Sequence, residues 1–505
     1  MGLEMSASRL LAPYFGSSML VWANLIGLIL IGLTAGYYLG GHLADRRPHP
    51  PLLFGIALAA GLLMAAVPWW ARPAFAAMAS VDILEAQPRV VVGSFAAAAA
   101  AFLPAAVLLG CVSPFALRLY NLHLETTGRA GGELYAISTA GSVFGIFVTT
   151  FGLVPAVGTR WSMGAWALAL VGIAGAGLVW SGGRASRRRG AVALAILAAL
   201  AGAAALAALG ARGPMRPREG LLEERESLYQ FAQVVEDRDG NRYLLANEGG
   251  GVQSIYRPGS LTTELYFDLM AIVPLWAPGD PVRVLIVGYA GGTLERQMQG
   301  LLGVRGPLQV EGVEIDPAMV ELGRRHLRSP ATAVAVEDAR TFVAGAAARG
   351  RSYGAVLIDA YSRELYIPFH LATVEFFRHV DAVLEPGGLV ALNVNSTRPD
   401  GLLLHSIGRT MGAVWPYVYV VPAGYFNYLL LAGRRAEPWR GVGPGLRAGP
   451  GLSELLGEFG RRVRPFRPAA GSRVLTDDHA PVEFLTDWMV VEFGRQPGAG
   501  GAGGR

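Results

Sequence analysis

Six long stretches without an acidic or arginine side chain fill most of the first 211 residues. They cover residues 10–44, 48–71, 90–117, 134–159, 161–183 and 190–211. Each is long enough for the roughly 20 apolar residues that a helix needs to cross a bilayer core. Because backbone groups in lipid must be satisfied internally, such stretches form helices. We therefore expect a polytopic α-helical membrane region over 1–211, with six full spans and a partial N-terminal segment.

Charge divides the chain into two parts. Residues 1–210 carry 12 arginines and 6 acids, whereas residues 211–505 carry 31 arginines and 32 acids. The net charge of +5 therefore comes from arginines beside the apolar stretches, which argues against nucleic acid as a partner. The chain has no lysine and a single cysteine, Cys111. These counts exclude lysine Schiff-base chemistry, an intrachain disulfide and a cysteine-based zinc site, and we expect no metal.

The second part alternates strand and helix patterns. A linker is expected over 212–222, a small domain with an antiparallel sheet (229–256) over 223–275, and a disordered glycine-rich tail over 495–505. The strands expected beyond the small domain are 284–287, 309–314, 333–336, 355–358 and 389–394, and the helices are 291–300, 317–327 and 371–385. This alternation is typical of a parallel sheet with helices on both faces. It predicts an α/β, Rossmann-like domain over 276–494.

Potential ligand-binding groups follow four successive strands of this sheet. They are the glycine-rich turn with Gly288, Gly291 and Gly292, then Glu314, Asp338 and Asp359. Open parallel sheets bind ligands at these strand ends, and an acid after the second strand can accept both hydroxyls of a ribose. Glu314 and Asp338 also have a plainer interpretation as helix N-terminal acids. The four positions together predict a nucleoside-type site.

The same residues resemble the spermidine synthase family of polyamine aminopropyltransferases. The matching motifs are 284–294, 313–317, 337–342, 358–361, 367–370 and 384–388, with 226–230, Tyr266 and 273–275 upstream. The whole chain is similar to bacterial members that are fused to membrane helices, through segments such as 9–16 and 134–139. The resemblance implies a class I methyltransferase-like fold after the membrane region and allows a homodimer.

The resemblance also implies an activity and a set of site residues. The family moves an aminopropyl group from decarboxylated S-adenosylmethionine to an amine, usually putrescine, and releases methylthioadenosine without a tightly bound cofactor. By resemblance, Glu314 holds the ribose, Asp338 with Ala339 the adenine, and Gln230 the nucleoside or its thioether, while Asp359 aims and deprotonates the amine. The residues expected on the amine side are Tyr266, Ser362, Glu364, Asp477 and Asp478.

Three positions depart from the pattern with which this family holds a diamine. An acid of the glycine-rich turn is replaced by Tyr289-Ala290, an acid three residues after Asp359 by Ser362, and a histidine after Tyr266 by Phe267. Because a buried cation needs a paired charge, these changes weaken the case for putrescine. The acids that could substitute are Glu364, Asp477, Asp478 and Glu483. We interpret His370 and His479 as structural residues.

Two other functions stay open from the sequence. One keeps the fold and uses S-adenosylmethionine itself for methyl transfer to a membrane-associated amine. The other is a non-catalytic nucleoside sensor on a membrane domain. The resemblance to bacterial members places the chain in the inner membrane, with the lipid bilayer and a small amine as partners. Arginines after alternate stretches would put the second part outside the cell, but we expect it in the cytoplasm, where the donor is made.

Overall fold

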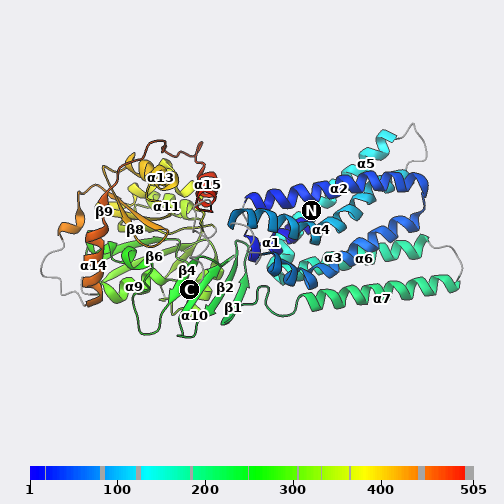
Figure 1. The fold of residues 1–505 in the computed structure, drawn as a ribbon, viewed down its shortest axis with the longest axis horizontal. Coiled ribbons are helices and arrows are strands. Elements are labelled where there is room, and N and C mark those ends of the chain that lie inside the picture. Colours follow the sequence, from blue (N-terminus) through cyan, green and yellow to red (C-terminus); the bar gives the residue numbers. More distant parts are fainter. Residues whose placement is uncertain are drawn as a thin grey trace. The chain divides into compact units, whose positions relative to one another are not determined.

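The chain forms two compact units, Met1–Pro217 and Arg218–Arg505, which the colour bar of Figure 1 separates at the transition to green. The computed structural model describes residues 1–16, 19–79, 86–120, 127–181, 186–247, 249–303, 306–330, 332–362, 365–441 and 450–494. The expected tail over 495–505 lies outside these residues. The division between the units falls within the expected linker.

Helices build the first unit. They are α1 (Gly2–Phe15), α2 (Met19–Arg46), α3 (Pro50–Ala79), α4 (Ala86–Tyr120), α5 (Thr127–Phe147), α6 (Val154–Ser181) and α7 (Ser186–Gly210), with a π-helical segment at Val148–Leu153. Among the described residues, five helical runs are long and apolar enough to cross a membrane. The fourth run, Gly128–Ser181, covers 54 residues and holds two of the six expected stretches, 134–159 and 161–183. Gly158 lies between them with φ 79, so the helical path breaks there.

Small residues let the helices of this unit meet closely. A Cβ atom on Gly36 of α2 would lie 2.2 Å from the carbonyl oxygen of Val107 and 2.8 Å from the Cα of Gly110 in α4, so only glycine fits. Across the same pair of helices, the Asn24 side-chain amide donates to the Ser94 hydroxyl at 3.0 Å. Close backbone contact and interhelical hydrogen bonds are what hold apolar helices together where the hydrophobic effect is absent.

The second unit begins with a four-stranded antiparallel sheet of β1 (Leu221–Glu226), β2 (Phe231–Glu236), β3 (Arg242–Ala246) and β4 (Val252–Tyr256), in that order. Its first strand therefore starts inside the expected linker and before the expected sheet at 229. One face of the sheet packs Val234 and Leu244 against Met319 and Leu322. These two residues belong to the larger domain, which fixes the small sheet over one end of it.

The larger domain is an eight-stranded sheet in the order β12-β10-β11-β9-β8-β5-β6-β7. Its strands are β5 (Val282–Val287), β6 (Leu308–Glu314), β7 (Val334–Val336), β8 (Tyr353–Ile358), β9 (Leu384–Asn395), β10 (Tyr417–Pro422), β11 (Asn427–Gly433) and β12 (Arg464–Pro465). Strands β5 to β9 pair in parallel, and β11 runs antiparallel to both β9 and β10. The short strand β12 at the edge runs antiparallel to β10. Apart from this edge strand, a parallel sheet with one reversed strand inserted near its end is the class I methyltransferase arrangement.

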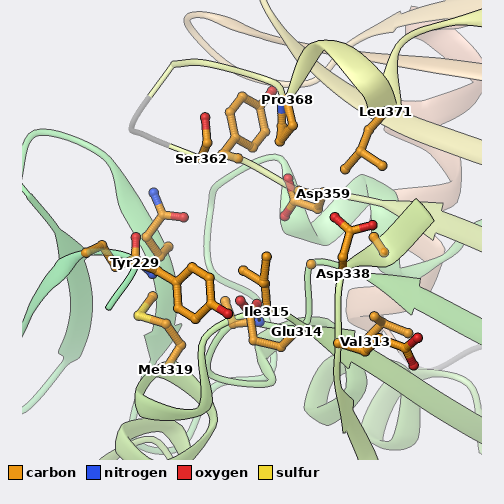
Figure 2. Close-up of a pocket in the computed structure, with 18 of the residues that line it drawn as sticks. Tyr229, Val313, Glu314, Ile315, Met319, Asp338, Asp359, Ser362, Pro368 and Leu371 are labelled. Carbon is orange, nitrogen blue, oxygen red and sulfur yellow. Dashed lines mark hydrogen bonds between the residues drawn. The ribbon is translucent and has the colours of Figure 1, made fainter. Parts of the chain in front are cut away.

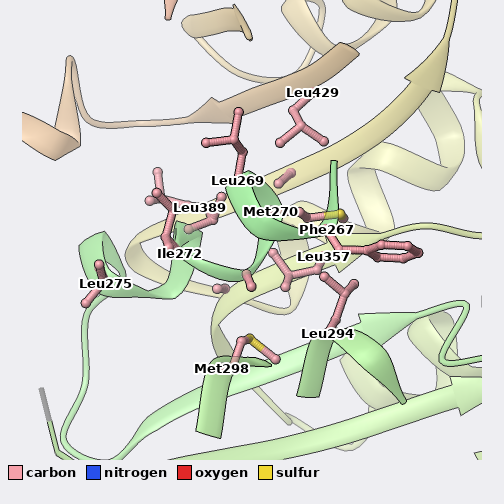
Figure 3. Packing of buried hydrophobic residues seen from close by; sticks show 14 of the residues in the cluster. Phe267, Leu269, Met270, Ile272, Leu275, Leu294, Met298, Leu357, Leu389 and Leu429 are labelled. Carbon is pink, nitrogen blue, oxygen red and sulfur yellow. The ribbon is translucent and has the colours of Figure 1, made fainter. Parts of the chain in front are cut away.

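Two clusters of buried apolar residues pack against this sheet, and helices cover both of its faces (Figure 1). The helices of the unit are α8 (Phe267–Ala271), α9 (Thr293–Leu301), α10 (Pro317–His326), α11 (Ala339–Ala348), α12 (Val374–Ala382), α13 (Leu402–Gly412), α14 (Pro450–Arg462) and α15 (Val482–Gly494). Figure 3 shows one layer, in which Leu269 and Met298 pack against Leu357 and Leu429 of the sheet. All six residues of β8 are buried, as expected for a central strand.

The largest differences in extent from the sequence prediction in the larger domain are at the end of α12 and the start of β9. The helix expected over 371–385 is α12, which ends at Ala382, because the chain already extends from Leu384 as the start of β9. The Tyr353 amide donates to the carbonyl of Val383 at 2.7 Å, which draws this segment to the edge of β8. The Pro-Gly-Gly sequence after Glu385 lies within the strand and not after a helix.

Candidate active site

A cavity of about 230 Å³ lies at the carboxyl ends of β5, β6, β7 and β8, with the small sheet on one side (Figure 2). Its lining contains the strand-end groups that the sequence indicated. The lining residues are Tyr229, Gln230, Gln253, Gly288, Ala290, Val313, Glu314, Ile315, Met319, Glu337, Asp338, Ala339, Asp359, Ala360, Tyr361, Ser362, Pro368, His370 and Leu371. The three acids Glu314, Asp338 and Asp359 thus share one cavity.

The turn after β5 holds Glu314 in place. Gly288 has φ 85, and a Cβ atom there would lie 2.3 Å from the carbonyl oxygen of Asp359, so a side chain is excluded. The Ala290 amide donates to Glu314 Oε2 at 2.8 Å, and the Asp316 amide donates to Oε1 at 3.0 Å. Burial raises the pKa of Glu314 to about 7, although these two amides oppose the shift. Each oxygen retains lone pairs that can accept a ligand hydroxyl.

The neighbouring residue Asp316, and not Glu314, caps the helix that follows. Asp316 is the N-cap of α10, where its side chain accepts from the Ala318 amide at 2.9 Å. The second oxygen of Asp316 accepts from the Ser227 hydroxyl at 2.7 Å, which ties the small sheet to this helix. Glu314 is therefore left to face the cavity.

Asp338 caps a helix and also lines the cavity. Its Oδ1 accepts from the Thr341 amide at the start of α11 at 3.0 Å, and its Oδ2 lies 3.2 Å from Nε2 of His370. Burial opposes ionisation, but the Thr341 amide and His370 outweigh it and hold the pKa of Asp338 below its usual value. His370, interpreted from sequence as structural, lines the cavity beside this carboxylate.

Asp359 is held by hydrogen bonds from two elements distant in sequence. The Tyr266 hydroxyl donates to Oδ2 at 2.8 Å, and the Asn393 amide donates to Oδ1 at 2.9 Å. Asn393 is fixed in turn by the amide of Asn427, whose Nδ2 lies 3.1 Å from its Oδ1. Burial raises the pKa of Asp359 to about 6, and the two donors oppose this shift. Burial beside Asp359 also raises the pKa of Tyr266, so its hydroxyl stays a donor.

The structure does not bring all expected residues to the cavity. Gly291 and Gly292 lie in the turn behind it, where the Gly291 amide donates to the Ser254 hydroxyl at 2.9 Å. Asp477 binds the Arg340 guanidinium at 2.7 Å. Asp478 is exposed, and neither Asp477 nor Asp478 lines the cavity. Ser362 does line it, Tyr266 reaches it through Asp359, and Glu364 lies outside the described residues.

Several residues at the site were not identified from the sequence. They are Gln253, Tyr361 and Leu371 in the lining, and Asn393 and Asn427 behind Asp359. Asn393 is the one polar residue in the stretch 389–394 of β9, next to β8, which Asp359 directly follows. That isolated amide was a usable signal, whereas Gln253 stands in a polar segment with nothing to distinguish it.

Comparison with known proteins identifies the family of this chain. No family model matches the chain. The polyamine aminopropyltransferase of Vibrio vulnificus is 31% identical over 183 residues, which cover 35% of this chain and 60% of that protein. The polyamine aminopropyltransferase of Synechococcus sp. strain JA-3-3Ab is 31% identical over 219 residues, which cover 40% of this chain and 67% of that protein. This chain belongs to the polyamine aminopropyltransferase family.

The family relationship covers part of each protein. The chain spans about three fifths of the length of the Vibrio aminopropyltransferase. Among solved structures, the spermidine synthase from Thermotoga maritima matches with a TM-score of 0.38 and 17% sequence identity, over 47% of this chain and 84% of that chain.

Proposed function

We propose that this aminopropyltransferase-family protein moves the aminopropyl group of decarboxylated S-adenosylmethionine to an amine and releases methylthioadenosine. The convergence of Glu314, Asp338 and Asp359 on one cavity carries this proposal. Glu314 would accept the ribose hydroxyls and Asp338 the adenine amino group, which leaves Asp359 at the next strand end for the reacting amine.

The charges around the cavity favour the decarboxylated donor. Four lining residues carry carboxylates, Glu314, Glu337, Asp338 and Asp359, and the described lining contains no arginine. The carboxylate of S-adenosylmethionine would therefore enter without a cationic partner, which is costly in a partly buried site. A donor with an ammonium and a sulfonium is instead attracted. The difference in charge between the two donors therefore weighs against the methyltransferase alternative.

Asp359 is positioned to act on the attacking amine. The amine nitrogen forms a bond to the propyl carbon beside the sulfonium, the carbon–sulfur bond breaks, and its electron pair returns to sulfur as the neutral thioether. The proton released from the amine passes to the Asp359 carboxylate. With a pKa of about 6, this carboxylate is ionised at neutral pH and is a better base than an ordinary aspartate. Tyr266 and Asn393 fix both of its oxygens, and such positioning supplies much of the rate of a displacement.

We further propose that the protein is anchored in the bacterial inner membrane with Arg218–Arg505 in the cytoplasm. The five long apolar helices and the cytoplasmic origin of the donor support this proposal. Glu219 stands beside the first strand with 86% of its side chain exposed, and Cys111 is buried. A membrane-impermeant maleimide should label Glu219→Cys only after the cells are permeabilised. Labelling of intact cells would place the unit outside.

Product analysis tests the activity directly. The full chain in detergent, given decarboxylated donor and a pool of amines, should produce methylthioadenosine and amines heavier by one aminopropyl group, as measured by mass spectrometry. S-adenosylhomocysteine formed from S-adenosylmethionine would support the methyltransferase instead. Donor binding by calorimetry without any product would support the sensor.

A further inference from the structure

We infer that the amine acceptor has a single basic nitrogen, the one that attacks after losing its proton, and ends in an uncharged group. This inference rests on the proposed function and deepens it, because it names a monoamine where the family usually takes a diamine. It depends on how the acceptor side of the cavity is lined and on where the replaced residues point.

The acceptor side, beyond the end of β8, is lined mainly by uncharged residues. Ser362, Pro368 and Leu371 lie on this side with Asp359 (Figure 2), and Tyr361, which precedes Ser362 in the chain, also lines the cavity. The other lining acids follow β6 and β7, on the nucleoside side, where Glu314 holds two backbone amides and Asp338 caps α11. Among the described lining residues, Asp359 is thus the carboxylate available to the acceptor.

The residues at the replaced positions do not place a charged side chain in the cavity. Tyr289 is 3% exposed, and its hydroxyl donates to Oε2 of Glu295 at 2.7 Å, inside the domain. Ala290 contributes only a methyl group and the amide that binds Glu314. Phe267 is 2% exposed within the apolar layer of Figure 3, with its ring centroid 4.1 Å from that of Tyr266. Phe267 therefore serves the core, where a histidine of the family pattern would serve a ligand.

Of the four acids that could have substituted, the three described ones lie elsewhere, and Glu364 lies outside the described residues. Asp477 is paired with Arg340 and accepts from the Thr373 hydroxyl at 2.8 Å. Asp478 and Glu483 are also absent from the described lining. A second ammonium on the acceptor side would lose water without gaining a described carboxylate, whereas an apolar or hydroxyl end would contact Tyr361, Pro368 and Leu371.

A pair of acceptors of equal length tests the inference. The full chain is assayed with decarboxylated donor and either n-butylamine or putrescine, and kcat/KM is measured from the methylthioadenosine released. We expect n-butylamine to be the better substrate by about tenfold. A putrescine value equal to or above that of n-butylamine overturns the inference while leaving the proposed function intact. If no amine yields methylthioadenosine, the proposed function fails and the inference with it.

Two variants of one residue show whether charge sets this preference. Ser362→Asp should raise the putrescine to n-butylamine ratio of kcat/KM at least tenfold, because it places a carboxylate on the acceptor side. Ser362→Asn, of the same size without the charge, should leave the ratio near its original value. Glu364→Gln should also leave it unchanged. A loss of putrescine transfer in Glu364→Gln would overturn the inference by revealing a second carboxylate.

Discussion

The nucleoside side and the acceptor side of the same cavity are built differently. On the nucleoside side, Glu314 and Asp338 are bound by backbone amides that lie within the motifs 284–294, 313–317 and 337–342. On the acceptor side, Asp359 depends on Tyr266 and Asn393, 93 and 34 residues away in sequence. Under the proposed function, donor recognition would therefore depend on short segments, whereas acceptor recognition would be assembled by the fold.

The largest effect should come from the acceptor side. Asp359→Asn removes the proton acceptor while keeping the size of the side chain, so kcat should fall about 10³-fold, within the range typical of general bases. Donor affinity, measured by calorimetry, should change less than threefold, because the nucleoside side is untouched. A wild-type rate in the variant would show that Asp359 is not the base. The wild-type rate itself should decline as pH falls through about 6, where Asp359 becomes protonated.

A change on the nucleoside side should act on binding instead. Glu314→Gln keeps the shape but weakens acceptance from the ribose hydroxyls and the two amides, so donor affinity should fall about 10- to 100-fold. Glu311→Gln is the matched control, because Glu311 lies on the same strand and pairs with Arg351 at the surface. Equal losses of donor affinity in the two variants would contradict the proposal that Glu314 binds the donor.

Replacing Asn393 should have a smaller effect than the two changes above, because this residue acts through Asp359. Its amide lowers the pKa of Asp359, so Asn393→Ala should move the acidic limb of the pH–rate profile to higher pH and lower kcat by about tenfold. Tyr266→Phe, which removes the other donor, should shift the limb in the same direction. An unchanged profile in both variants, with a lower rate, would indicate a structural role only.

The smallest effect concerns stability. Burial raises the pKa of Asp359 from 3.8 to about 6, so the folded unit favours the protonated form. That contribution is complete below about pH 4 and is lost as pH rises through 6. Asp359→Asn should therefore be more stable than wild type at pH 8 by about 1 kcal/mol, or about 2–4 °C in Tm, and equal to it at pH 4. A lower Tm at pH 8 would contradict this reasoning.

The apolar helices and the parallel strands could be predicted because each has a local pattern in the sequence. The stretches 134–159 and 161–183 were separated by one arginine in the sequence, and the structure breaks the helical path at Gly158 nearby. The ends of the helices and strands were harder to predict from the sequence. The start of β1 at Leu221 depends on its pairing with β2, and the end of α12 at Ala382 on the pairing of β9 with β8, and local composition does not record either pairing.

By itself, the sequence determined that acids stand at successive strand ends after a glycine-rich turn, because strand periodicity and glycine requirements are local. Only the tertiary structure decided which of the other polar residues join them. In the folded chain, Asn393 and Tyr266 donate hydrogen bonds to Asp359. Asp477 pairs with Arg340, and Tyr289 and Phe267 are buried in the core. Side chains separated by many residues meet only when the sheet and its covering helices pack, and that packing sets which charges reach the acceptor.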